Sequence, residues 1–167
     1  VSGCHILVDL ILRSSDKVLI GAHKANLETY SDGFPSADSV DDTHEPVDLT
    51  ERAGTLKQLM HGMHKQKFVS LDTLRDADTA FDLAEAAEKY LVYSVMAACS
   101  EKCATTTSPV KAFCYGIKHD YPLIADAAAR WTIDVEVKTM RESLNGDKSA
   151  LLAWVRHFSL SVLQRIH

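Results

Sequence analysis

The first third of the chain changes from an extended pattern of apolar residues to a helical one. Apolar residues run almost continuously over His5–Arg13, which is typical of a buried strand. The polar residues 14–17 form a turn cluster, and Val18–Ala22 predicts the returning strand of a β-hairpin. The period then becomes that of a helix, whose inner face would carry His23, Leu27, Tyr30 and Phe34.

Two loop signals and a third short strand follow this first helix. Asp32 and Gly33 are expected to stop the helix, since glycine tolerates the left-handed conformation that often ends one. The acidic segment 36–45 has no periodicity and predicts an exposed loop, and Val47–Leu49 predicts a strand. Thr50 is then expected to cap a helix with one apolar face, formed by Leu56, Leu59, Met60 and Met63.

Two further helices are predicted before residue 105. Asp78 or Thr79 is expected to cap the first, in which Ala80, Ala84, Ala87 and Leu91 share one side. The second follows Tyr93 and carries its apolar residues at helical spacing, with Val95, Cys99 and Cys103 on one face.

The last third of the chain reads as a series of helices divided by clear stops. Ser108 and Pro109 open one helix, whose inner face we expect to be Val110, Phe113, Cys114 and Ile117. Pro122 opens the next, with Ile124, Ala128 and Trp131 expected to be buried. A stop at 145–147 separates a weaker helix from a terminal one whose stripe is Leu151, Val155, Phe158, Val162 and Ile166, with Trp154 beside it.

These patterns together predict three short strands near the start of the chain, followed by a series of helices, which indicates an α+β fold.

Composition and charge narrow the classes of function. The chain has 167 residues, of which 46% are hydrophobic and 25% charged, as in ordinary globular proteins. A net charge of −5 and the lack of a basic stripe argue against a nucleic-acid partner. The apolar run Ile6–Leu12 is interrupted by Asp9 and is shorter than the ~20 residues that a bilayer span needs. We therefore expect neither a nucleic-acid nor a membrane partner.

The four cysteines are too few and too often in helical sequence to indicate a disulfide framework. No signal-peptide pattern is present, so we expect Val1 to be a trimmed end of the chain. These features predict an intracellular protein, cytoplasmic or nuclear.

One set of side chains offers metal or thiol chemistry. His61 and His64, with Cys99 and Cys103, could supply a tetrahedral zinc site, and a small metal- or thiol-dependent enzyme is the alternative that this set defines. The spacing matches neither a zinc finger nor a metalloprotease helix. We instead expect the two cysteines to be buried as small apolar residues and the two histidines to lie at an exposed helix end.

No nucleophile-elbow, dinucleotide or phosphate-loop motif occurs in the sequence. His23 could act as a general base, but its apolar face favours a core histidine, satisfied by a backbone carbonyl or by a carboxylate such as Asp9. The sequence therefore predicts a protein that is not an enzyme, with no catalytic residue, no metal and no cofactor.

The order of these segments resembles the BTB/POZ domain. The signature of that family has an Asp at the first core strand, then a strand, a His, a Leu, and a Ser and Phe about a turn later. In this chain the matching residues are Asp9, His23, Leu27, Ser31 and Phe34. Residues 47–66 resemble the short third strand and the helix pair after it, and residues 83–102 resemble the helix with the A-x-KY motif and its partner. Residues 115–132 and 150–158 are similar to the extension of a large group of fungal BTB-domain proteins.

The resemblance implies a small three-stranded sheet flanked by paired α-helices, with a core at residues 1–107 and extra C-terminal helices, packed on the core, at 108–167. It also implies a protein–protein interaction module, often homodimeric, that in many relatives is an adaptor for a cullin-3 ubiquitin ligase or a transcriptional regulator. It places the candidate partner surface at and after a helix end, at His61, His64, Lys65, Phe68 and Leu71. Cullin-binding relatives often carry a hydrophobic-x-Glu motif there, and residues 64–71 contain no Glu, which argues against cullin-3 as the partner. Only eight residues precede Asp9, so the sequence does not support a strand-exchanged dimer.

Overall fold

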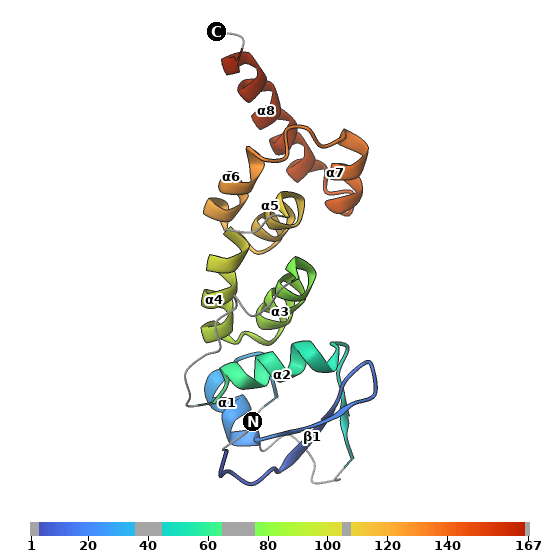
Figure 1. The fold of residues 1–167 in the computed structure, drawn as a ribbon, viewed down its shortest axis with the longest axis vertical. Helices are drawn as coiled ribbons and strands as arrows, with labels where there is room; N and C mark the ends of the chain where they lie inside the picture. Colours follow the sequence, from blue (N-terminus) through green and yellow to red (C-terminus); the bar gives the residue numbers. More distant parts are fainter. Residues whose placement is uncertain (1–3, 36–44, 65–75, 105–107, 166–167) are drawn as a thin grey trace. The chain divides into compact units, whose positions relative to one another are not determined.

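The computed structural model describes residues 4–35, 45–64, 76–104 and 108–165, with side chains as far as residue 156. The chain forms two compact units, Val1–Ser100 and Glu101–His167 (Figure 1). The described residues form a small three-stranded sheet and eight helices, which confirms the predicted α+β class. The boundary expected after residue 107 stays a prediction.

The sheet of the first unit is built around a β-hairpin. The strands β1 (Leu10–Arg13) and β2 (Leu19–Ala22) are antiparallel, with Leu12 opposite Ile20. The two-residue strand β3 (Val47–Asp48) pairs with β1 in parallel, which gives the order β2-β1-β3. The hairpin and the third strand were predicted correctly, but β1 is shorter than the predicted strand His5–Arg13. Residues 6–8 are exposed and lie outside the ladder, which an apolar run alone cannot reveal.

Helix α1 (Lys24–Tyr30) follows β2 directly and ends at Ser31, which is extended. The prediction that Gly33 ends this helix in a left-handed conformation was wrong, since Gly33 does not have a positive φ. Its backbone N–H donates to the carbonyl of Tyr90 at 3.0 Å. A Cβ at Gly33 would lie 2.5 Å from the Cα and carbonyl carbon of Tyr90, so glycine is required here for close approach of two backbones.

Three helices complete or extend the first unit: α2 (Ala53–Gly62), α3 (Ala77–Tyr90) and α4 (Tyr93–Ala104). The predicted apolar face of α2 is buried, at Leu56, Leu59, Met60 and Met63. The N-caps predicted for α2 and α3 were wrong. The first N–H of α2, at Ala53, donates to the carboxylate of Asp16 at 2.9 Å, and α3 is capped by Asp76, which accepts from the N–H groups of Asp78 and Thr79.

The second unit contains α5 (Pro109–Lys118), α6 (Pro122–Ala129), α7 (Val137–Ser143) and α8 (Lys148–Arg165). The stop between α7 and α8 is confirmed, because Asn145 and Gly146 both have positive φ. Trp154 of α8 is buried, and its Nε1–H donates to Thr132 Oγ1 at 2.7 Å. This bond ties α8 to the segment after α6.

Two burial predictions for the second unit were wrong. The buried residues of α5 are Ala112, Phe113, Tyr115 and Gly116, while Val110 and Cys114 are half-buried and Ile117 is exposed. Gly116 sets this orientation, because a Cβ there would lie 2.7 Å from the backbone N of Ala125 in α6. Trp131 is 68% exposed, because α6 ends before it and Arg130 lies over its ring.

Candidate functional site

Two residues of the predicted signature fix the junction between the sheet and α1. Asp9 Oδ1 accepts a hydrogen bond from the backbone N–H of Lys24 at 2.8 Å, at the first residue of α1. His23 is 4% exposed, and its Nδ1 lies 2.8 Å from the carbonyl oxygen of Leu7. The core histidine is therefore satisfied by a backbone carbonyl, one of the two predicted partners, while Asp9 acts on the helix N-terminus instead.

The other three signature residues join α1 to the end of α3. Leu27 lies within α1 and is the buried residue of that helix. The Ser31 hydroxyl donates to the carbonyl of Tyr90 and accepts from the N–H groups of Gly33 and Phe34. The rings of Phe34 and Tyr90 are stacked, with centroids 4.3 Å apart and planes within 5°. All three residues therefore serve packing in the first unit.

A charged network lies on the other side of Tyr90. Glu51 accepts from Lys89 Nζ at 2.7 Å, from the Tyr90 hydroxyl at 2.8 Å and from Thr50 Oγ1 at 2.9 Å. Burial acts to raise the pKa of Glu51, but these three hydrogen bonds outweigh burial and hold that pKa below its ordinary value. The Lys-Tyr pair at the end of α3 thus contacts both α1 and the segment before α2.

The zinc set predicted as an alternative does not assemble in the described part of the chain. Cys99 and Cys103 are buried, as expected for small apolar residues. His61 and His64 lie in and just after the last turn of α2, and among the described residues neither cysteine belongs to a group with metal-ligand geometry that includes these histidines. The rival enzyme built on these four residues has no site here.

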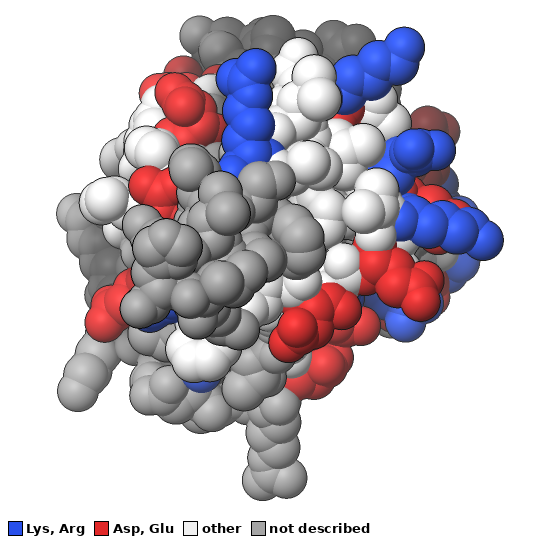
Figure 2. Space-filling view, turned by 90° about the horizontal axis from the view of Figure 1, so that it is seen from above, with Lys and Arg blue, Asp and Glu red and all other residues white. Residues whose placement is uncertain are grey.

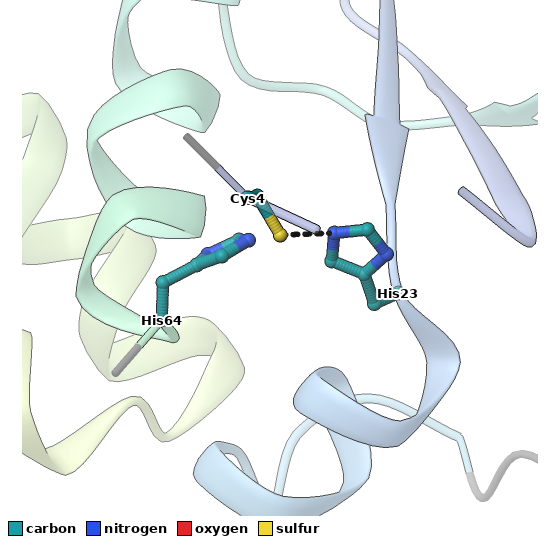
Figure 3. A group of neighbouring side chains, drawn as sticks. All are labelled: Cys4, His23 and His64. Carbon is teal, nitrogen blue, oxygen red and sulfur yellow. Dashed lines mark hydrogen bonds between the residues drawn. The ribbon is translucent and has the colours of Figure 1, made fainter. Parts of the chain in front are cut away.

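A different group with metal-ligand geometry does assemble, from Cys4, His23 and His64 (Figure 3). Their ligand atoms all lie within 4.8 Å of one another. Cys4 Sγ lies 3.3 Å from His23 Nε2, and the two imidazole rings meet edge to face with centroids 5.3 Å apart. His64 is turned toward His23, and both His61 and His64 are half-buried, so the expectation of two histidines at an exposed helix end was wrong.

Sequence reasoning missed this cluster because its members share no motif. Cys4 lies 19 residues before His23, and His64 lies just after the end of α2. His64 directly follows Met63 of the apolar face predicted for α2, which is a signal that could have placed it near a buried face, but the prediction put both histidines of α2 at an exposed helix end.

Of the predicted partner surface, His61 and His64 lie in the described part of the chain and both are half-buried. Lys65, Phe68 and Leu71 lie outside the described residues. The partner surface as a whole stays a prediction.

Charge and hydropathy of the described residues give further limits. Figure 2 shows basic and acidic side chains interspersed on the face drawn. None of the helices in the described part of the chain is both long and apolar enough to cross a membrane.

Comparison with known proteins gives no family assignment. No protein-family model matches the chain, and no curated protein matches it either.

Proposed function

We propose that this chain is a BTB/POZ-type protein–protein interaction module with a C-terminal helical extension of the kind found in fungal BTB-domain proteins. It acts without chemistry of its own, associates with a second copy of itself and recruits another protein. The compartment that suits its free cysteines is reducing and intracellular, cytoplasmic or nuclear.

One observation carries this proposal: two motifs of the resemblance meet in space. Ser31 and Phe34 belong to the motif around α1, and Tyr90 belongs to the A-x-KY motif of α3, 59 residues after Ser31. The hydroxyl of Ser31 bonds the Tyr90 carbonyl, and Phe34 stacks on the Tyr90 ring. Residues retained by chance in unrelated sequence would have no reason to form one packed junction.

The chain connectivity adds support. A β-hairpin, a short helix and a third strand parallel to the first are followed by α2, α3 and α4 in the order that the resemblance implies. The signature Asp and His lie at the turn from the hairpin into α1, where they hold the helix rather than line a cavity.

The exposed apolar residues of the first unit supply a surface for self-association. Ile6, Leu7, Val8 and Leu19 are all more than half exposed, with Leu7 at 86%. They lie beside β2, which is an edge strand of the described sheet. An edge strand flanked by exposed apolar side chains is suited to pairing with another chain. Because BTB/POZ domains are often homodimeric, we take that other chain to be a second copy of this one.

Light scattering coupled to size-exclusion chromatography across a dilution series tests self-association. We expect a concentration-dependent dimer for the wild-type chain and a monomer for Leu7→Asp. The matched control is Leu123→Asp, because Leu123 is 83% exposed but lies in the first turn of α6, in the second unit. A wild-type monomer at high concentration, or equal weakening by both variants, would count against the proposal.

A second test concerns the recruited protein. Direct titration of purified cullin-3 against the chain is expected to show no binding, since residues 64–71 contain no Glu. Saturable binding that His61→Ala weakens would instead assign the cullin-adaptor role.

A further inference from the structure

We propose that Cys4, His23 and His64 bind a transition-metal ion, which we expect to be zinc. The bound ion connects the N-terminal segment to α1 and α2. This site does not rest on the proposed interaction function, and it shares only His64 with the four-residue set that the sequence suggested.

The hydrogen bonds of the two imidazoles fix which nitrogens are free to bind metal. His23 Nδ1 lies 2.8 Å from the Leu7 carbonyl oxygen, and His64 Nδ1 lies 2.6 Å from the Met60 carbonyl oxygen. A carbonyl oxygen can only accept, so each Nδ1 must carry the proton. In a neutral ring, each Nε2 then carries the lone pair that can bind a metal ion. Backbone carbonyls orient both rings, as they commonly orient metal-ligating histidines.

The proton count leaves one acceptor without a donor. The Cys4 thiol has one proton, and its sulfur lies 3.3 Å from His23 Nε2. His64 Nε2 is buried and has no hydrogen-bond partner. A buried polar atom without a partner is costly, and a metal ion would satisfy both Nε2 atoms and the sulfur at once.

The distances suit zinc after a small closure. Zinc bonds of ~2.0–2.1 Å to nitrogen and ~2.3 Å to sulfur place tetrahedral ligand atoms roughly 3.4–3.6 Å apart. The Cys4 to His23 separation of 3.3 Å is already close to this value, and the remaining separations do not exceed 4.8 Å. Movement of Cys4 and His64 by about 1 Å therefore completes a three-ligand site, with a fourth position for water or another donor.

The nature of the ligands selects the metal class. One thiolate and two neutral imidazoles favour zinc or copper(I) over magnesium or calcium, which prefer oxygen. Binding of Zn²⁺ forms a zinc–sulfur bond and releases the Cys4 thiol proton to solvent, with no change of oxidation state. Because Cys4 precedes the strand and His64 follows α2, the ion would link three segments of the first unit (Figure 3).

The test uses the full chain freed of metal by a chelator and then titrated with Zn²⁺ by calorimetry. We expect one zinc per chain and a rise in thermal midpoint. With Co²⁺ as the probe, a thiolate-to-cobalt charge-transfer band should appear in the near ultraviolet. Cys4→Ser should abolish that band, and both Cys4→Ser and His64→Gln should weaken zinc binding by at least tenfold.

Matched controls separate ligation from general loss of thiols or imidazoles. Cys114→Ser changes another half-buried thiol, in the second unit, and His61→Gln changes a half-buried histidine less than one turn away on α2. Both should bind zinc as the wild-type chain does. His23 is not used here, since its substitution would disturb a buried bond of the fold.

The proposal is overturned if the wild-type chain takes up no zinc, or if Cys4→Ser and His64→Gln bind it as tightly as the controls. Competition with copper(I) distinguishes the two metals. Uptake of copper(I) at this site without uptake of zinc would also overturn the assignment.

Discussion

Replacement of Gly33 by alanine should weaken the first unit, because the new methyl group has no room. The Cβ would lie 2.5 Å from the Cα and carbonyl carbon of Tyr90 and 2.6 Å from its oxygen. Comfortable carbon–carbon contacts are about 3.5–4.0 Å, so one backbone must move by roughly 1 Å. Overpacking of this kind costs about 1–3 kcal/mol, and the upper half applies here because the obstacle is backbone rather than a flexible side chain.

The matched control is Gly54→Ala. Gly54 is exposed in the first turn of α2, and nothing lies within 4 Å of its added Cβ. Alanine is the better helix former, so this variant should gain up to about 1 kcal/mol. The two glycine substitutions should therefore move stability in opposite directions.

Urea denaturation followed by far-ultraviolet circular dichroism checks this expectation. A loss of ~2 kcal/mol with a slope of about 1–3 kcal/mol per molar lowers the midpoint by roughly 1–2 M. Tryptophan fluorescence is the wrong probe, since Trp131 and Trp154 both lie in the second unit. Hydrogen exchange localises the effect, with faster exchange expected at the N–H of Gly33. A Gly33→Ala chain as stable as Gly54→Ala would refute the close-approach argument.

Three further substitutions test single contacts. Ser31→Ala removes a buried hydroxyl with three hydrogen bonds and should cost about 1–3 kcal/mol in urea denaturation, and wild-type stability would contradict its role at Tyr90. The pKa of Glu51 is lowered in the folded chain, so its stabilising effect is complete above the ordinary pKa of 4.5 and is lost as the pH falls through the folded pKa. Glu51→Gln should therefore reduce the loss of folding stability at acid pH. An unchanged dependence of stability on pH would contradict the role of the Glu51 network. Trp154→Phe removes the donor to Thr132 and should destabilise the second unit by about 1–2 kcal/mol, measured by fluorescence of the remaining tryptophan, while an unchanged unfolding curve would exclude a role for this bond.

The parts of the fold that depend on local spacing were predictable from the sequence. The hairpin, the short third strand and the apolar face of α2 follow from periods of two and 3.6 residues, which the chain shows within a few residues. The N-terminal cap of α2 was not predictable, because the first N–H of that helix donates to Asp16, from the turn between β1 and β2. A side chain so far away along the chain leaves no mark beside the helix that it caps.

The burial predictions for the second unit were wrong for a related reason. Helical spacing predicted one face of α5 to be buried, but a different face is buried, the one on which Gly116 closely approaches Ala125. Trp131 was assigned by its size and apolar character, yet it falls after the last turn of α6 and remains exposed. Which of two apolar faces is buried depends on the partner helix, and the partner is not encoded locally.

The candidate metal cluster could not be predicted for the same reason, because its contacts join segments that are far apart in the sequence. His23 was identified as a core histidine and its carbonyl partner was among those expected, since both follow from its place on an apolar face. Its contacts with Cys4 and His64 required three segments to be folded together. Sequence reasoning finds metal sites where ligands have a fixed spacing, and these three do not.

His23 is the residue at which the interaction module and the metal site meet, and its two nitrogens allow the two roles to be separated. Nδ1 bonds the Leu7 carbonyl and serves the fold, whereas Nε2 faces Cys4 and serves the proposed site. In metal-free protein, His23→Ala should cost about 1–3 kcal/mol through the lost buried bond, measured by urea denaturation.

Cys4→Ser in the same metal-free protein should cost much less, because it leaves the Nδ1 bond intact. With zinc added, the wild-type chain should gain stability that rises with the logarithm of the ratio of free zinc to the dissociation constant, and both variants should gain little. Equal losses for the two variants without metal would mean that the Cys4 contact, rather than the Leu7 carbonyl, holds His23 in place.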